Sequence, residues 1–153
     1  IFMQFQKIDS TNDIQEIIHN AFNMKLDING SWGYDQNNPT IINSLGEFAK
    51  EELQLTLMSM RAHIEMSMML SEEDRYGGIN PSEISREEII LNNKVYEKVI
   101  YKISATKDLI NKKLMKEYKE RLGQEDFDIE AHFKEREKNS LEIISEYWYD
   151  IRN

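Results

Sequence analysis

The sequence predicts an all-α fold: a helical bundle of about four helices, with an irregular loop or small hairpin between helices one and two. Three observations support this prediction. Capping patterns stand at Ser44 and Asn80, long amphipathic stretches follow them, and only residues 24–43 lack helical spacing. A chain of 153 residues can bury roughly 70% of the surface of its unfolded state. We therefore expect one helical domain spanning residues 1–153.

The first two predicted helices follow from capping residues and apolar spacing. The first begins near Thr11 as its N-cap. Its apolar residues recur at intervals of three and four and therefore share one face: Ile14, Ile17, Ile18 and Phe22. The second begins at Ser44, which forms a capping box with Glu47, and runs to about Glu73.

The third and fourth predicted helices occupy most of the second half of the chain. The third opens at Asn80 and Pro81 and ends at Gly123, either as one helix or as a short helix followed by a longer one. Its apolar stripe consists of Tyr96, Val99, Ile100, Ile103, Ile110, Leu114 and Tyr118. Its opposite, basic stripe consists of Lys94, Lys98, Lys102, Lys112, Lys116 and Lys119. The fourth helix begins near Asp126–Asp128 and closes at Ile151.

Charge is divided unevenly along the chain. Residues 94–122 carry nine basic and four acidic side chains, whereas the whole chain has a net charge of −9. Because binding of nucleic-acid phosphates depends on Lys and Arg, the negative net charge of the chain argues against nucleic acid as a partner. The lysine stripe then predicts an ordinary solvated helix face, since Arg121 is its only arginine. No apolar run approaches the ~20 residues of a membrane span. We expect neither a nucleic acid nor a membrane as partner.

No motif for catalysis, metal binding or cofactor binding is complete. Glu16 and His19 match the Glu-x-x-His element of di-iron bundles, but the second such pair is missing. The chain has no cysteine, which excludes thiolate nucleophiles and zinc sites built on cysteine. We therefore predict no catalytic residue, no metal and no cofactor, and expect that the protein is not an enzyme. An acid–base pair assembled from distant residues stays open.

Two acidic connections that carry large aromatic side chains are the best candidates for a binding surface. Tyr and Trp bring large contact area to protein interfaces. The predicted partner-binding residues are Trp32, Tyr34 and Asp35 in the first connection, and Glu72, Glu73, Asp74 and Tyr76 in the second. The alternative is that Trp32 closes the end of the bundle and that the acidic residues are ordinary solvated turn residues.

Three stretches, residues 30–35, 60–66 and 75–80, resemble the small helical immunity proteins of bacterial polymorphic-toxin and contact-dependent growth-inhibition systems. The resemblance implies a cytoplasmic protein that neutralises a cognate toxin domain, often a nuclease, by direct stoichiometric binding. The resemblance implies no catalytic residue in this chain, because immunity proteins of this kind have none. A nuclease presents a basic cleft, which would attract the acidic connections.

A second class of function, other than toxin neutralisation, is also compatible with the sequence. Helix two is crowded with methionines, and flexible thioethers serve both irregular cores and adaptable binding surfaces. They are Met58, Met60, Met66, Met68 and Met69. The alternative function is therefore a self-associating helical interaction module without catalytic activity, with helix two as the seam of a homodimer.

Overall fold

The protein is a mixed α/β structure, so the prediction of an all-α helical bundle is wrong. The computed structural model describes residues 5–9 and 13–152. Its elements in chain order are α1 (Ile14–Phe22), β1 (Ile28–Gly30), β2 (Thr40–Ile42), α2 (Lys50–Met69), the 3₁₀ turn η1 (Glu72–Asp74), β3 (Tyr76–Leu91), β4 (Lys94–Lys107), α3 (Asp108–Arg121), α4 (Ile129–Lys138) and β5 (Ser140–Ile151).

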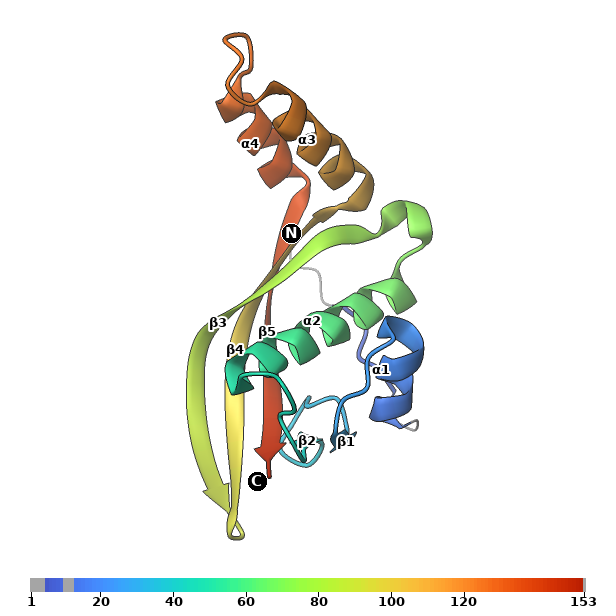
Figure 1. Ribbon diagram of the computed structural model, residues 1–153, viewed down its shortest axis with the longest axis vertical. Coiled ribbons are helices and arrows are strands. Elements are labelled where there is room, and N and C mark those ends of the chain that lie inside the picture. Colours follow the sequence, from blue (N-terminus) through green and yellow to red (C-terminus); the bar gives the residue numbers. More distant parts are fainter. Residues whose placement is uncertain (1–4, 10–12, 153) are drawn as a thin grey trace.

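The strands of the described chain form one five-stranded sheet in the order β1-β2-β5-β4-β3. Its neighbours are antiparallel except for β2 and β5, which are parallel. Helices α1 and α2 lie against one face of this sheet (Figure 1). Side chains of β4 alternate between the two faces, and Val99, Tyr101 and Ile103 are buried in the core on the α2 side. The core therefore lies between α2 and the long strands.

Strands β3 and β4 occupy most of the region predicted as helix three, and only its last part, α3, is helical. Asn92 and Asn93 connect the strands with φ angles of 51° and 63°, the left-handed values of a two-residue hairpin turn. Pro81, predicted to open a helix, lies on the edge strand β3, where its missing N–H costs no inner ladder bond. The predicted lysine stripe is accordingly split between β4 and α3.

The predicted fourth helix is correct only for α4. After Asn139 the chain becomes β5, which pairs with β4 from Ser140 to Asp150. Three aromatic residues in succession, Tyr147, Trp148 and Tyr149, lie in this strand. Aromatic side chains favour the pleated, half-buried environment of a strand over a helix.

The first half of the chain agrees better with the predictions. The predicted helix one corresponds to α1, although Asp13 caps it; Thr11 lies outside the described residues. Helix two corresponds to α2 but begins at Lys50, and Ser44 instead accepts a hydrogen bond from the Gly46 N–H in the preceding turn. Between them, β1 and β2 form the small two-stranded hairpin that was predicted as one alternative for residues 24–43.

Gly33 holds the loop between β1 and β2 against β5. Its φ is +74°, and a Cβ placed on it would clash with the ring of the buried Tyr147. We expect Gly33→Ala to lower the free energy of unfolding by about 2–4 kcal/mol, from backbone strain and overpacking together. Gly46→Ala is the matched control, because Gly46 has φ +60° and nothing within 4 Å of its Cβ position. Equal losses for both variants in urea unfolding would contradict this packing.

Helices α3 and α4 form a hairpin inserted between β4 and β5. The two strands stay paired up to Thr106 and Ser140, whose hydroxyls are 2.7 Å apart, and the chain then leaves the sheet. The hairpin projects beyond the end of the sheet, away from α1 and α2 (Figure 1). Much of the hairpin therefore lies outside the cover of α1 and α2.

Candidate functional site

Trp32 is a core residue and not a surface anchor. Its side chain is fully buried, with 0% of its surface exposed. Its carbonyl oxygen accepts a hydrogen bond of 2.9 Å from Nη1 of Arg61 on α2. A side chain in this position can contact a partner protein only after local unfolding, and the role of Trp32 in partner binding stays a prediction.

Tyr34 and Asp35 serve the local structure of the same loop. The Tyr34 hydroxyl donates to Oε2 of Glu65 at 2.8 Å and accepts from the backbone N–H of Ile8. Asp35 is exposed, and its Oδ1 accepts from the Asn37 N–H and the Asn38 side chain in a tight turn. The bonds of Tyr34 hold it half-buried against α2.

The second predicted group lies elsewhere. Glu72, Glu73 and Asp74 are exposed in η1, while Tyr76 is half-buried and its backbone N–H points to the sulfur of Met66. η1 lies beside α3, whereas the loop with Trp32 is bonded to β5 through Gly33 and Trp148. The structure does not bring the two predicted connections together into one surface.

Arg61 is the centre of a buried polar cluster that sequence reasoning did not predict. Its guanidinium is fully buried between the rings of Tyr34 and Tyr147, at 4.5 and 4.4 Å from their centroids. Besides the Trp32 carbonyl, it donates to Oγ of Ser145 and to the carbonyl of Glu146, both at 2.7 Å. Arg61 thus ties α2 to the β1–β2 loop and to β5.

Glu65, one helical turn after Arg61, faces a cavity of about 270 Å³ whose lining also includes Lys7, Tyr34 and Ser145. Burial raises the pKa of the Glu65 carboxyl, against the charges of Arg61 and Lys7 and the hydrogen bond from Tyr34, which lower it. A carboxyl of this kind can exchange a proton, but its known contacts are those that fix the β1–β2 loop. We assign it to the stability of the fold.

The pH dependence of stability tests the raised pKa of Glu65. Because the native pKa of Glu65 exceeds its ordinary value of 4.5, the native state binds the proton more tightly than the unfolded state. Its contribution to stability is full below pH 4.5 and is lost as pH rises through the raised pKa. Glu65→Gln, which cannot ionise, should therefore gain stability relative to the natural protein between pH 4.5 and 7.5. Urea unfolding at the two pH values measures this, and a difference that does not change with pH would contradict it.

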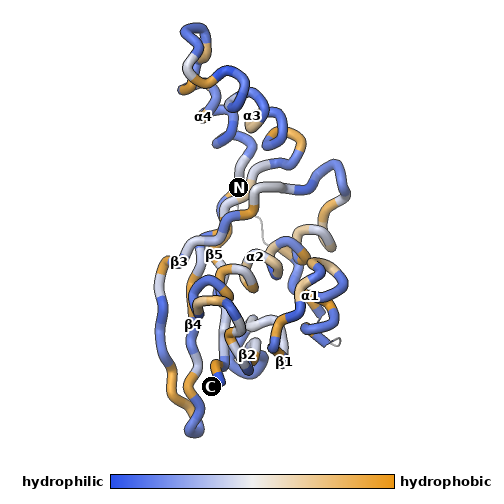
Figure 2. The backbone as a smooth tube through the Cα atoms, in the orientation of Figure 1, coloured by the Kyte–Doolittle hydropathy of each residue, from blue (hydrophilic) through white to orange (hydrophobic). Residues whose placement is uncertain are grey.

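The α3–α4 hairpin carries a concentration of exposed apolar side chains. Both helices are mainly hydrophilic along the tube in Figure 2, with hydrophobic residues only at intervals. Among the described residues, the large apolar side chains that are exposed on this hairpin and its caps are Leu109, Met115, Tyr118, Leu122, Ile129 and Phe133. α3 contacts α4, β3, β4 and η1, and α4 contacts α3 and β5, but these neighbours leave an apolar face of each helix uncovered.

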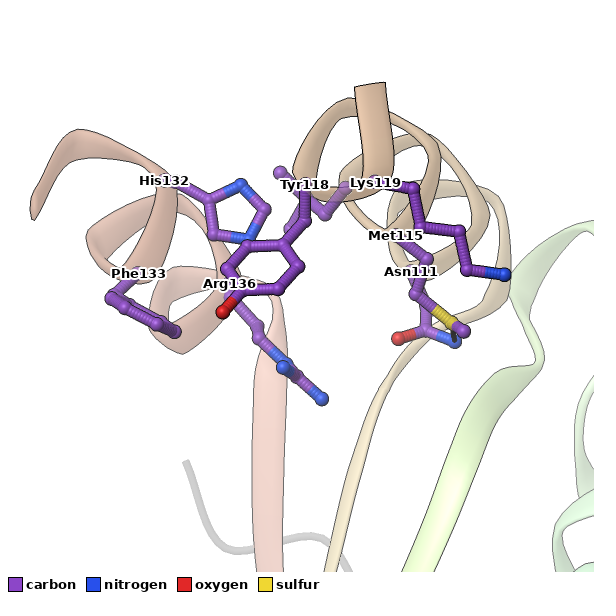
Figure 3. A pocket seen from close by; sticks show the side chains of 8 residues that line it. Asn111, Met115, Tyr118, Lys119, His132, Phe133 and Arg136 are labelled. Carbon is purple, nitrogen blue, oxygen red and sulfur yellow. Dashed lines mark hydrogen bonds between the residues drawn. The ribbon is translucent and has the colours of Figure 1, made fainter. Parts of the chain in front are cut away.

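Between the two helices lies a cavity of about 300 Å³ with mainly apolar walls. Figure 3 shows its side chains: Met115, Tyr118 and Lys119 come from α3, and Phe133 and Arg136 from α4. Met115 and Phe133 are each 49% exposed at its mouth. We call these five residues the hairpin groove. It offers an apolar depression with two cations at its edge.

His132 fixes the floor of the hairpin groove. It is buried among the rings of Tyr118, Phe127 and Phe133, with centroid distances of 5.4–5.6 Å. Its Nδ1 has no hydrogen-bond partner among the described residues and lies 3.7 Å from Oε1 of Glu117. The aromatic packing holds α4 against α3 and so keeps the groove in shape.

The methionines of α2 do not form an exposed surface along the helix. Met58, Met60 and Met66 are buried in the core, and Met68 is the exposed member of the predicted set. In the part of the chain that the structure describes, no group of three or more His, Asp or Glu side chains could hold a metal ion. No helix of that part is both long and apolar enough to cross a bilayer.

Comparison of the chain with protein-family models, with curated proteins and with solved structures found no match.

Proposed function

We propose that this protein neutralises a bacterial toxin domain by direct stoichiometric binding, and that the hairpin groove contacts the toxin. The observation that supports this proposal is the uncovered apolar surface of α3 and α4, on an element that projects from the sheet. Contiguous exposed apolar surface on a monomer is characteristic of protein-binding sites. The sequence resemblance to immunity proteins supplies the class of partner.

The binding surface that we propose differs from the one that the sequence predicted. Trp32 is buried and Tyr34 is bonded to Glu65, so neither is free to anchor a partner. Met115, Tyr118 and Phe133 take that role in the proposal, because they combine large side chains with a concave setting. The exposed acids of η1, next to α3, remain candidates for the rim of the interface.

The experiment begins at the neighbouring open reading frame, which should encode a large secreted toxin. Its C-terminal domain, co-expressed with this protein, should lose its toxicity and elute with it as a 1:1 complex in size-exclusion chromatography with light scattering. A neighbouring domain that remains toxic, or that forms no complex, would contradict the proposal.

The variant Met115→Lys/Phe133→Lys tests the surface. Single truncations at the centre of an interface typically cost about 2 kcal/mol or more, so we expect this double variant to lose at least about 30-fold in affinity for the toxin domain. The matched control is Ile90→Lys/Val95→Lys, which changes two exposed apolar residues at the β3–β4 turn and should lose less than about threefold. Isothermal titration calorimetry measures both. Equal losses would place the interface elsewhere.

A further inference from the structure

The two sides of the α3–α4 hairpin differ in charge. The cavity of the hairpin groove is lined by the cationic residues Lys119 and Arg136, and its lining includes no carboxylate. The neighbouring depression on the other side of the hairpin has four carboxylates in its lining, those of Glu117, Asp126, Asp128 and Glu135, against the two cations Lys113 and Arg121. The groove is therefore a positive, apolar surface on a protein whose net charge is −9.

The two cations of the groove, Lys119 and Arg136, form no ion pair with another described residue. Among the described residues, the ion pairs of the hairpin are Lys112–Asp108, Arg121–Asp126 and the contact of His132 with Glu117. Neither Lys119 nor Arg136 has an ion-pair partner in the described part of the chain. Their charges are available to a molecule that occupies the groove.

We propose that the occupant of the hairpin groove is an acidic amphipathic segment of the partner protein. An apolar side chain of this segment fills the cavity against Met115, Tyr118 and Phe133, and its flanking carboxylates pair with Lys119 and Arg136. This inference rests on the proposed function and adds the chemistry of the contact. It reverses the expectation of a basic cleft, because a basic segment would meet two unpaired cations at the edge of an apolar surface.

A second copy of this chain is a poorer occupant. A two-fold contact through the groove would place the same patch of each copy against the other. Lys119 and Arg136 of both copies would then lie around one axis, without carboxylates of the cavity lining to balance them. Like charges opposed across an interface are unfavourable.

Two synthetic peptides test the inference. Both are 18-residue amphipathic helices labelled with fluorescein, with the same leucine stripe, and they differ only in carrying Glu or Lys beside it. Fluorescence anisotropy should show that the intact protein binds the Glu peptide at least tenfold more tightly than the Lys peptide at low salt. The preference should shrink at higher salt, because exposed charges are screened.

Two double variants test whether the cations of the groove cause the preference for the Glu peptide. Lys119→Glu/Arg136→Glu should reverse the peptide preference. Lys113→Glu/Lys134→Glu changes the same total charge on the same two helices, outside the groove, and should keep it. Equal or tighter binding of the Lys peptide, no binding of either peptide, or an equal effect of the control pair would overturn the inference. A dimer that dissociates in Met115→Lys, measured by sedimentation, would assign the groove to a second copy instead.

These outcomes differ from those that test the proposed function. If the Lys peptide binds in the groove and the toxin domain still needs Met115 and Phe133, the proposed function stands and only the acidic partner is wrong. If the toxin domain binds Met115→Lys/Phe133→Lys as tightly as the natural protein, the proposed binding surface itself is wrong.

Discussion

Replacement of Arg61 by alanine should lower the free energy of unfolding by about 3–5 kcal/mol. The change removes the donor for the buried carbonyl oxygen of Trp32, for the partly buried carbonyl oxygen of Glu146 and for the Ser145 hydroxyl. It also empties the space between two tyrosine rings that are packed on the guanidinium. Unsatisfied acceptors and a new cavity both act against the native state, so the effects add in the same direction.

Arg61→Lys separates charge from geometry. Lysine keeps the positive charge but has no planar fork, so it cannot bridge α2, the β1–β2 loop and β5 at once. We expect a loss between those of alanine and the natural protein, measured by urea unfolding. A loss below about 1 kcal/mol for Arg61→Ala would show that the cluster contributes little to stability.

Trp32→Ala should also cost about 3–5 kcal/mol of unfolding free energy, which is the usual range for removing a fully buried tryptophan. The result distinguishes a buried core position of Trp32 from an exposed position in the partner-binding surface. Removal of a core tryptophan lowers the free energy of unfolding. Removal of an exposed interface anchor lowers the affinity for the partner and leaves the free energy of unfolding nearly unchanged.

Trp32→Phe is the control, because it keeps an aromatic ring in the core, and we expect it to lose less than half as much as Trp32→Ala. Thermal and urea unfolding, combined with toxin affinity under conditions where both variants are folded, measure the two quantities. Full stability with weakened toxin binding in Trp32→Ala would contradict the buried position.

The sequence predicted the elements whose apolar residues have one period only. In α1, intervals of three and four fit a helix and no strand, and the glycines and proline of residues 24–43 mark a connection. In β4, intervals of four join Val95 to Val99 and Ile103, and Lys94 to Lys98. An interval of four suits both a helix and a strand, because it is even, so periodicity alone could not decide.

The residue types of this segment favour a strand over a helix. Residues 95–106 are rich in β-branched and aromatic side chains, which favour the pleated environment of a sheet. The dipeptide Asn92-Asn93 supplies the positive φ angles of a tight turn and was the available signal for a hairpin. These signals outweigh the capping pattern at Asn80, which opens no helix in the structure.

The hairpin groove could not be predicted from the sequence for a related reason. A continuous third helix would have placed Ile110, Leu114 and Tyr118 in the core of a bundle. Once β4 takes the residues up to Lys107, α3 packs on α4 and on β3, β4 and η1 instead of in the core of a bundle, and Met115, Tyr118 and Phe133 stay uncovered. Surface exposure here depends on where the strand ends, which is a property of the whole fold.

Hydrogen–deuterium exchange with and without the proposed partner, the toxin domain, tests the proposed binding surface most directly. We expect the toxin to slow exchange of backbone amides in α3 and α4, strongest around Met115 and Phe133, and to leave the loop that contains Trp32 unchanged. Slower exchange in residues 31–35 or in β3, with α3 and α4 unchanged, would contradict the assignment of the interface to the hairpin groove.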